Sequence, residues 1–194
     1  MGPELAFGEG QTPIAEEERR GLKLPLLTQR QLDEAEQLNI EQALLWLLGK
    51  QLTPEDILSE DFIRNLHRRM FKNVWKWAGD FRRTEKNIGV SWVRIPRELR
   101  VLCDDARYWV AHDVYDRREA ALRFKHRLVS IHCFPNGNGR HSRMMADALA
   151  ENAFGQPAFS WGAGLTAAGE ARRRYINALR NADGGDMQAL IDFA

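Results

Sequence analysis

The sequence predicts a mainly α-helical protein of one domain, with an amino-terminal arm and a small β-hairpin flap. The chain has 194 residues, of which 44% are hydrophobic and 28% charged, so it can bury one good core but hardly two. Apolar residues recur at helical spacing through most of the chain, and only residues 88–95 alternate as a strand would. Glycines and prolines punctuate residues 1–26, which we expect to be extended unless they pack on the body.

Start and stop signals divide the helical part of the chain. The amino-terminal boundary residues are small polar side chains or prolines, which satisfy or tolerate the free N–H groups of a first turn. Glycines mark several of the ends. We expect helices over residues 29–48, 54–75 with a second start at Ser59, 96–113, 117–132, 140–153, 167–179 and 187–193, with Thr28, Thr53, Pro96, Asp116 and Thr166 at their starts.

Composition excludes several classes of protein. The net charge of +1 provides no global basic field for nucleic acid, so no direct nucleic-acid partner is expected. Two cysteines, Cys103 and Cys133, cannot form a disulfide scaffold, and a reducing cytoplasm fits them best. We expect neither a signal peptide nor a membrane span, because no stretch is long and apolar enough.

The stretch from His132 to Arg143, His-Cys-Phe-Pro-Asn-Gly-Asn-Gly-Arg-His-Ser-Arg, concentrates the chemistry of the chain. An imidazole ends one predicted helix, two glycines turn the chain, and two arginines three residues apart lie in the first turns of the next helix. Exposed N–H groups, a helix amino terminus and guanidinium groups together favour a phosphate-handling site.

This stretch closely resembles the signature of the Fic family, His-x-Phe-x-(Asp or Glu)-Gly-Asn-Gly-Arg-x-x-Arg. The resemblance covers roughly residues 50–193 and includes the Trp-x-Trp-Ala-Gly sequence that ends at Gly79. Together with the arm and first helix, the chain is most similar to the subgroup called mobile mystery protein B. The resemblance implies a Fic-type helical bundle, divided here into an arm at 1–26, a regulatory helix at 27–49 and a Fic domain at 50–194.

The activity that the resemblance implies is transfer of AMP from ATP to a hydroxyl of Ser, Thr or Tyr in a target protein, with Mg²⁺ or Mn²⁺. His132 would be the general base, since an unperturbed imidazole pKa of about 6.5 suits that task. Phe134 would anchor the loop in the core. The implied nucleotide-binding residues are a weak metal position, an anion hole and two phosphate-binding arginines: Asn136, Gly137, Asn138, Gly139, Arg140 and Arg143.

Asn136 departs from the family pattern, in which a carboxylate at this position helps to hold the metal ion. An amide oxygen can coordinate a hard cation but brings no charge, so metal affinity should fall. Either the phosphates hold the metal, or the protein is a weakened nucleotide-binding module or a Fic-like phosphotransferase. A further alternative is a helical interaction module that uses the basic cluster Arg172, Arg173 and Arg174.

Two regulatory and docking hypotheses complete the expectations. Many Fic proteins carry an inhibitory helix, and residues 32–39 are a degenerate match, in which Glu36 would pair with Arg143 unless it is an ordinary exposed glutamate. The flap would receive a target segment as an added strand through Gly89, Val90, Ser91 and Trp92. The subgroup resemblance also implies a companion regulator, in a toxin–antitoxin-like pair.

Overall fold

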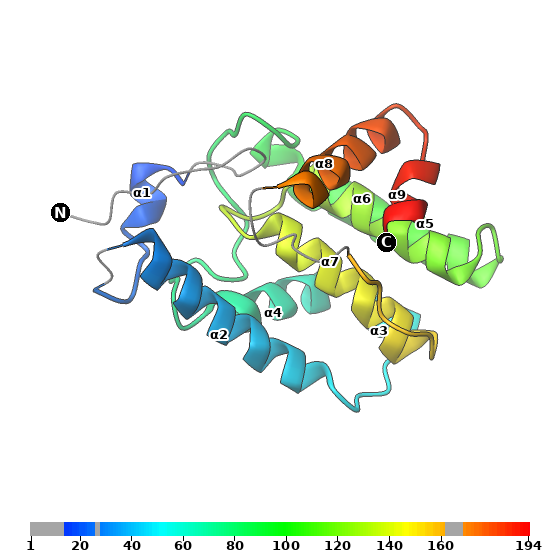
Figure 1. Cartoon of the computed structure of the whole chain (residues 1–194), viewed down its shortest axis with the longest axis horizontal. Helices are drawn as coiled ribbons and strands as arrows, with labels where there is room; N and C mark the ends of the chain where they lie inside the picture. The colour runs from blue at the N-terminus through cyan, green and yellow to red at the C-terminus, as the bar shows by residue number, and fades with distance from the viewer. Residues whose placement is uncertain (1–13, 26–27, 162–168) are drawn as a thin grey trace.

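The computed structural model describes residues 14–25, 28–161 and 169–194, and this part of the chain is helical (Figure 1). A short helix α1 (Glu16–Arg19) precedes the long helix α2 (Gln29–Leu47). The body contains α3 (Pro54–Ile57), α4 (Glu60–Phe71), a 3-10 turn η1 (Trp92–Arg94), α5 (Ile95–Ala111), α6 (Arg117–Ile131), α7 (Asn138–Ala148), a π-helical turn η2 (Leu149–Ala153), α8 (Glu170–Asp183) and α9 (Gln188–Phe193).

The predicted helix starts are confirmed where their caps can be seen. Thr28 Oγ1 accepts from the Gln31 N–H at the start of α2, and Ser59 Oγ accepts from the Phe62 N–H at the start of α4. Asp116 accepts from two N–H groups at the start of α6. The predicted cap Thr166 lies outside the described residues.

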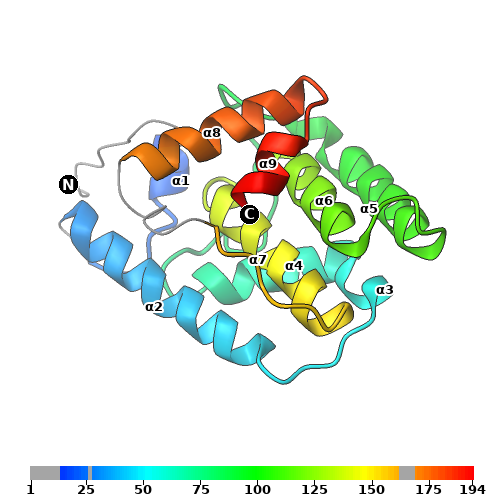
Figure 2. The same ribbon diagram turned by 45° about the vertical axis from the view of Figure 1, so that its right-hand side comes forward.

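Helix α7 lies in the middle of the molecule (Figures 1 and 2). It packs against α6 on one side and α4 on the other, while α2 lies across α4, and α8 with α9 covers α6. Several α7 residues are small or flexible apolar side chains with almost no exposure, such as Met145 and Ala146. The motif that the sequence predicts to handle phosphate therefore begins a largely enclosed helix, which gives the candidate site a rigid floor.

The described part of the arm packs on the body. Ile14 is buried, and residues 22 and 75 form an isolated antiparallel bridge. The Lys23 N–H donates to the Val74 carbonyl, and the Lys76 N–H donates to the Gly21 carbonyl, each at 2.8 Å. The arm is thus fastened to the turn that follows α4.

Helix α4 ends at Phe71, four residues before the predicted end. The chain then turns through residues 72–79, and Gly79 adopts φ +84°, a left-handed conformation that glycine accepts without strain. The Gly79 N–H donates to the ring Nδ1 of His67 on α4, so the corner folds back on the helix it follows.

The predicted β-hairpin flap is wrong: residues 88–91 form no strand, and residues 92–94 form the 3-10 turn η1 that leads into α5. Pro96 lies in the first turn of α5, where its fixed φ favours a helix. The last residues of the alternating stretch 88–95 are therefore helical. The Val90 N–H donates to the Ile131 carbonyl at the end of α6 instead of to a strand partner.

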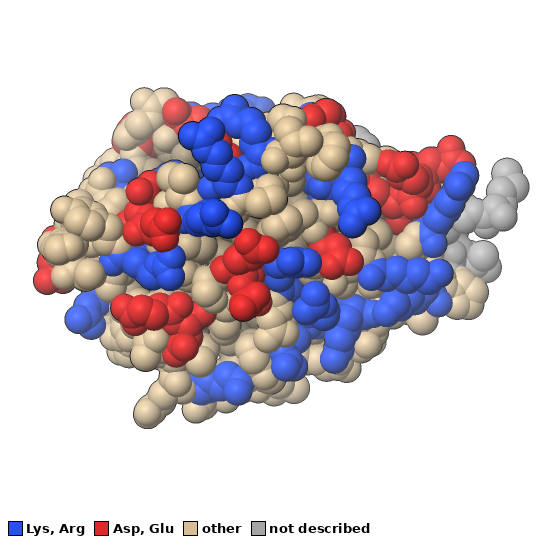
Figure 3. Space-filling model, turned by 180° about the vertical axis from the view of Figure 1, so that it is seen from behind, with Lys and Arg blue, Asp and Glu red and all other residues tan. Residues whose placement is uncertain are grey.

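The surface agrees with the balanced charge of the chain. On the face shown in Figure 3, basic and acidic side chains are interspersed. Among the described residues, no helix has the length and apolar character that a bilayer crossing requires.

Candidate active site

His132 ends α6 in a left-handed conformation, with φ 58° and ψ 59°. A non-glycine residue adopts this conformation only where surrounding contacts hold it, and such residues cluster at functional sites. Its side chain is largely enclosed, and the residue is 5% exposed. Gly89 lies so close that a Cβ built on it would be 2.6 Å from the His132 Cβ, so glycine is required there.

The imidazole of His132 is neutral at pH 7. Burial, followed by the nearby cations Arg82 and Lys86, lowers its pKa to about 4. The sequence suggested an ordinary imidazole with a pKa of about 6.5, and the structure corrects this, because enclosure by the loop from Arg82 to Val90 is a tertiary effect.

The loop after His132 is held by its own side chains and by α4. Asn138 accepts from the Phe134 N–H at 2.9 Å and donates to the Phe134 carbonyl at 2.8 Å. The Phe134 ring is fully buried and stacks on the His67 ring with 3.7 Å between centroids, so its predicted anchoring role is confirmed. The Asn138 side chain is therefore a clamp inside the loop rather than a free ligand group.

The amino terminus of α7 has the features of an anion site. Gly137 precedes it with φ +79°, and the position has no side-chain cap. A Cβ on Gly139 would meet nothing closer than the Arg143 Nη1 at 4.0 Å, so the surface above this turn is open. The first N–H groups of a helix have no partner within the helix and carry its positive dipole end, which suits phosphate.

The two motif arginines point to different neighbours. Arg140 forms an ion pair with Glu36 of α2, with Nη2 and Oε2 separated by 2.6 Å. Arg143 instead lies over the Tyr175 ring, with its Cζ 5.4 Å from the ring centroid. The expected pairing of Glu36 with Arg143 is therefore wrong, because α2 crosses the molecule beside the first of the two arginines.

Glu36 is not an ordinary exposed glutamate. It is 4% exposed, and its second carboxylate oxygen accepts from the indole N–H of Trp75 at 2.5 Å. A buried carboxylate that has two partners from other segments is fixed in place. The structure thus brings the predicted inhibitory residue to the mouth of the anion site.

Asn136 contributes little that could bind a metal ion. Its side-chain oxygen accepts from the Gly137 N–H at 2.6 Å, and its carbonyl accepts from His67. In the described part of the chain, no group of three or more His, Cys, Asp or Glu side chains could hold a metal ion. The described residues around the motif therefore do not fit a resident metal ion.

Sequence reasoning missed two residues beneath the site. His67 is fully buried; since its Nδ1 accepts from the Gly79 N–H, the other ring nitrogen carries the proton and donates to the Asn136 carbonyl. Burial holds its pKa well below the ordinary value. Arg82 binds the His132 carbonyl. A lone histidine within a helix, or a lone arginine in a loop, carries no sequence signal of such roles.

Cys133 has no visible part in the chemistry. Its thiol is buried, and burial raises its pKa far above the ordinary value, so no reactive thiolate forms at neutral pH.

Comparison with known proteins shows which family this part of the chain resembles. The family model described as Fic/DOC family matches residues 57–150. Curated relatives named Protein adenylyltransferase Fic include one from Culex quinquefasciatus, 26% identical over 161 residues, which are 80% of this chain and 31% of the relative. Another, from Drosophila grimshawi, is 29% identical over 148 residues, which are 74% of this chain and 28% of the relative. The chain thus spans less than a third of the length of these curated relatives.

Solved structures share the fold over most of the chain. Fic-1 (aa134–508) from C. elegans aligns with a TM-score of 0.69 and 25% identity, over 90% of this chain and 50% of that one. A BepC protein from Bartonella tribocorum with bound AMPPNP aligns with a TM-score of 0.67 and 18% identity, over 92% of this chain and 96% of that one.

The fold and the site together define a helical domain with a candidate anion site at the start of its central helix. More specifically, residues 57–150 match the Fic/DOC family model, and the fold is similar to that of Fic-1 from C. elegans.

Proposed function

We propose that this protein transfers AMP from ATP to a hydroxyl side chain of a target protein. The observation that carries the proposal is the juxtaposition of the neutral His132 with the open amino terminus of α7 and its two arginines. The curated relatives are named as adenylyltransferases, and BepC binds an ATP analogue, which supports the same reading.

In the proposed reaction the target hydroxyl oxygen attacks the α-phosphorus of ATP, and the bond from that phosphorus to the bridging oxygen breaks, releasing pyrophosphate. His132 takes the hydroxyl proton. Its low pKa describes the enclosed site without nucleotide. The negative charge of bound phosphates favours the imidazolium form, so nucleotide binding should raise that pKa and strengthen the base.

The chain's own groups can stabilise the charge that develops on the phosphates. The first N–H groups of α7 lie beside the open space above Gly139. Arg140 and Arg143 project from the same helix, Arg140 towards Glu36 of α2 and Arg143 towards Tyr175 of α8. Mg²⁺ would arrive with ATP, held by the phosphates, because Asn136 supplies no charge.

The test is incubation of the full chain, and of a bacterial lysate, with Mg²⁺ and ATP labelled at either the α- or the γ-phosphate. Label transferred from the α position, and lost in His132→Ala, supports AMP transfer. His112→Ala is the matched control, since His112 is exposed and far from the motif in sequence. Transfer from the γ position alone would instead identify a phosphotransferase, and equal transfer by His132→Ala would refute the role of His132.

We also propose that α2 restrains the enzyme through Glu36. The carboxylate occupies Arg140, which is a third exposed and would otherwise be available to a nucleotide phosphate. Glu36→Gly should therefore increase auto-modification, whereas Glu41→Gly, on an exposed position of the same helix, should not. No gain in the Glu36 variant over wild type would remove Glu36 from the account.

We propose that residues 89–92 contact the target protein. The Val90 N–H already donates to the Ile131 carbonyl, so it is not available to pair with a target strand. Trp92 is 39% exposed and offers an apolar contact instead. Membership of the mobile mystery protein B subgroup and a companion regulator likewise stay proposals based on sequence resemblance.

A further inference from the structure

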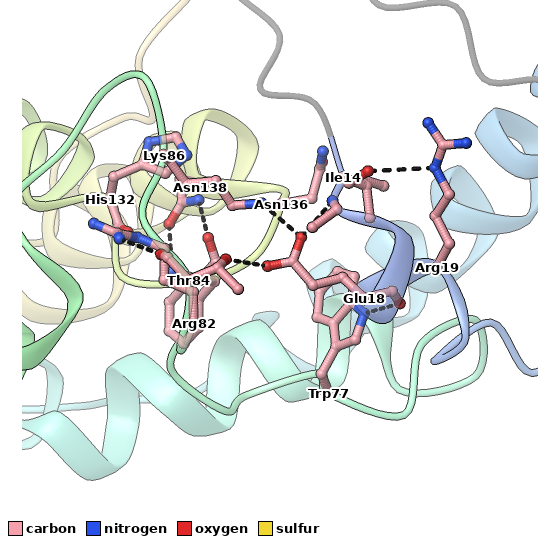
Figure 4. Close-up of polar contacts among 12 residues, drawn as sticks. Ile14, Glu18, Arg19, Trp77, Arg82, Thr84, Lys86, His132, Asn136 and Asn138 are labelled. Carbon is pink, nitrogen blue, oxygen red and sulfur yellow. Dashed lines mark hydrogen bonds and ion pairs between the residues drawn. The ribbon is translucent and has the colours of Figure 1, made fainter.

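The loop from Arg82 to Val90 closes against the end of α6, where His132 lies (Figure 4). Its first residue donates its N–H to the Cys133 carbonyl at 2.9 Å, and its last donates to the Ile131 carbonyl at 3.3 Å. The two attachment points flank His132 in the sequence, so the loop is anchored on both sides of the histidine.

The Arg82 guanidinium lies inside this loop and is completely enclosed, with no side-chain exposure. Its Nε donates to the His132 carbonyl at 2.6 Å, its Nη1 donates to the Thr84 carbonyl at 2.8 Å, and its Nη2 donates to the Val90 carbonyl. One rigid fork therefore joins the backbone of the histidine to both halves of the loop that covers it. Lysine, with a single point of charge, cannot bind three separated carbonyls in this way.

We propose that Arg82 is a positioning residue for His132: it stabilises the left-handed backbone of the histidine and holds the loop that encloses the imidazole. The left-handed conformation costs free energy, and the charged hydrogen bond to its carbonyl offsets that cost. The part of this proposal that concerns catalysis rests on the proposed function, whereas the part that concerns geometry does not.

The amino-terminal arm supports the same loop. Glu18 of α1 accepts from Lys86 Nζ at 2.5 Å and from Thr84 Oγ1 at 2.9 Å, and both of these residues lie within the loop. Figure 4 shows Glu18 reaching the loop from the arm, on the side opposite His132. Because the Glu18 and Lys86 side chains are only 8% and 5% exposed, this ion pair is shielded from water. Glu18 therefore provides a second, independent way to loosen the loop.

The geometric part can be tested by chemical modification of the full chain with diethyl pyrocarbonate, followed by mass spectrometry of each histidine. The chain has five histidines, and the exposed His112 reports the reagent's activity. His67 and His141, which are both almost completely buried, report global unfolding. In wild type we expect His132 to react slowly, as these two do.

Arg82→Gln should raise the modification rate of His132 about tenfold or more, because loss of a charged hydrogen-bond donor populates the open loop. Arg82→Lys should raise the His132 modification rate less, and Glu18→Gln should raise it about a few-fold. The modification rates of the two buried histidines, His67 and His141, should stay unchanged. Arg64→Gln is the matched control, since this guanidinium also binds a backbone carbonyl, that of Gly79, but does not contact His132. If every histidine of the Arg82→Gln variant reacts, that variant is unfolded. The His132 reactivity of Arg82→Lys and Glu18→Gln then tests the proposal. Unchanged His132 reactivity in the folded variants would overturn the proposal.

If Arg82 positions His132 for catalysis, Arg82→Gln should lower the kcat of AMP transfer and leave the KM for ATP nearly unchanged. Arg82→Lys should recover part of the lost kcat. If His132 becomes reactive in the variants but no transfer is detected in wild type, the proposed function fails while the positioning role stands. A changed KM with an unchanged kcat would contradict the assignment of Arg82 to His132.

Discussion

The buried histidines around the motif make the fold sensitive to acid, and His141 allows this effect to be isolated. His141 is 1% exposed, and its Nε2 donates to the Ile63 carbonyl at 2.9 Å. Burial lowers its pKa from 6.5 to about 3. In the unfolded chain the imidazole takes up a proton near its ordinary pKa, whereas in the folded chain it does not, so stability falls as the pH drops from 6.5 towards 3.

The size of the effect follows from the two pKa values. Between pH 7 and pH 5 the unfolded imidazole gains most of a proton and the folded one almost none, which corresponds to a loss of ~2 kcal/mol of unfolding free energy from His141 alone. His132, with a pKa of about 4, acts in the same direction. Asp147 acts in the opposite direction, because burial raises its pKa to about 6 and its protonation below that pH favours the folded state.

The assay is urea unfolding of wild type and His141→Gln at pH 7 and at pH 5. Glutamine can still donate to the Ile63 carbonyl but does not titrate, so the variant starts less stable at pH 7 and then loses about 2 kcal/mol less than wild type on acidification. Equal losses in the two proteins, within about 0.5 kcal/mol, would refute the reasoning that His141 is buried and neutral.

Two further predictions concern the fold around the site. Gly137→Ala should destabilise the protein by about 2 kcal/mol or more, because the position has φ +79° and a Cβ would lie 2.6 Å from the Phe71 Cζ. Gly139→Ala, whose Cβ meets no close atom, should change stability by less than about 0.5 kcal/mol. Similar melting temperatures for the two variants would contradict this prediction. Glu36→Ala should lower the unfolding free energy by about 1–3 kcal/mol more than Glu36→Gln, because alanine leaves the buried Trp75 indole N–H without its acceptor while glutamine can still accept. Urea titrations followed by tryptophan fluorescence measure both free energies. Equal losses in the two variants would show that the indole contact contributes little.

Much of the helical framework could be predicted from the chain because its signals are local. Thr28, Ser59 and Asp116 cap helices through side-chain contacts with residues two or three positions away, so the pattern and its cause lie in the same short stretch. The alternating residues 88–95 misled the prediction, because a strand needs a partner and this stretch instead bonds to the end of α6.

The amino-acid sequence by itself determined the motif that joins α6 to α7, since its histidine, glycines and arginines are consecutive and their order sets a turn between two helices. Only the tertiary structure decided which groups surround that motif. Glu36 meets Arg140 and Arg82 meets His132 from positions more than forty residues away, and the enclosure that lowers the His132 pKa comes from a loop packed on it. Such contacts depend on how whole helices and loops pack, so the spacing of residues within one segment does not predict them.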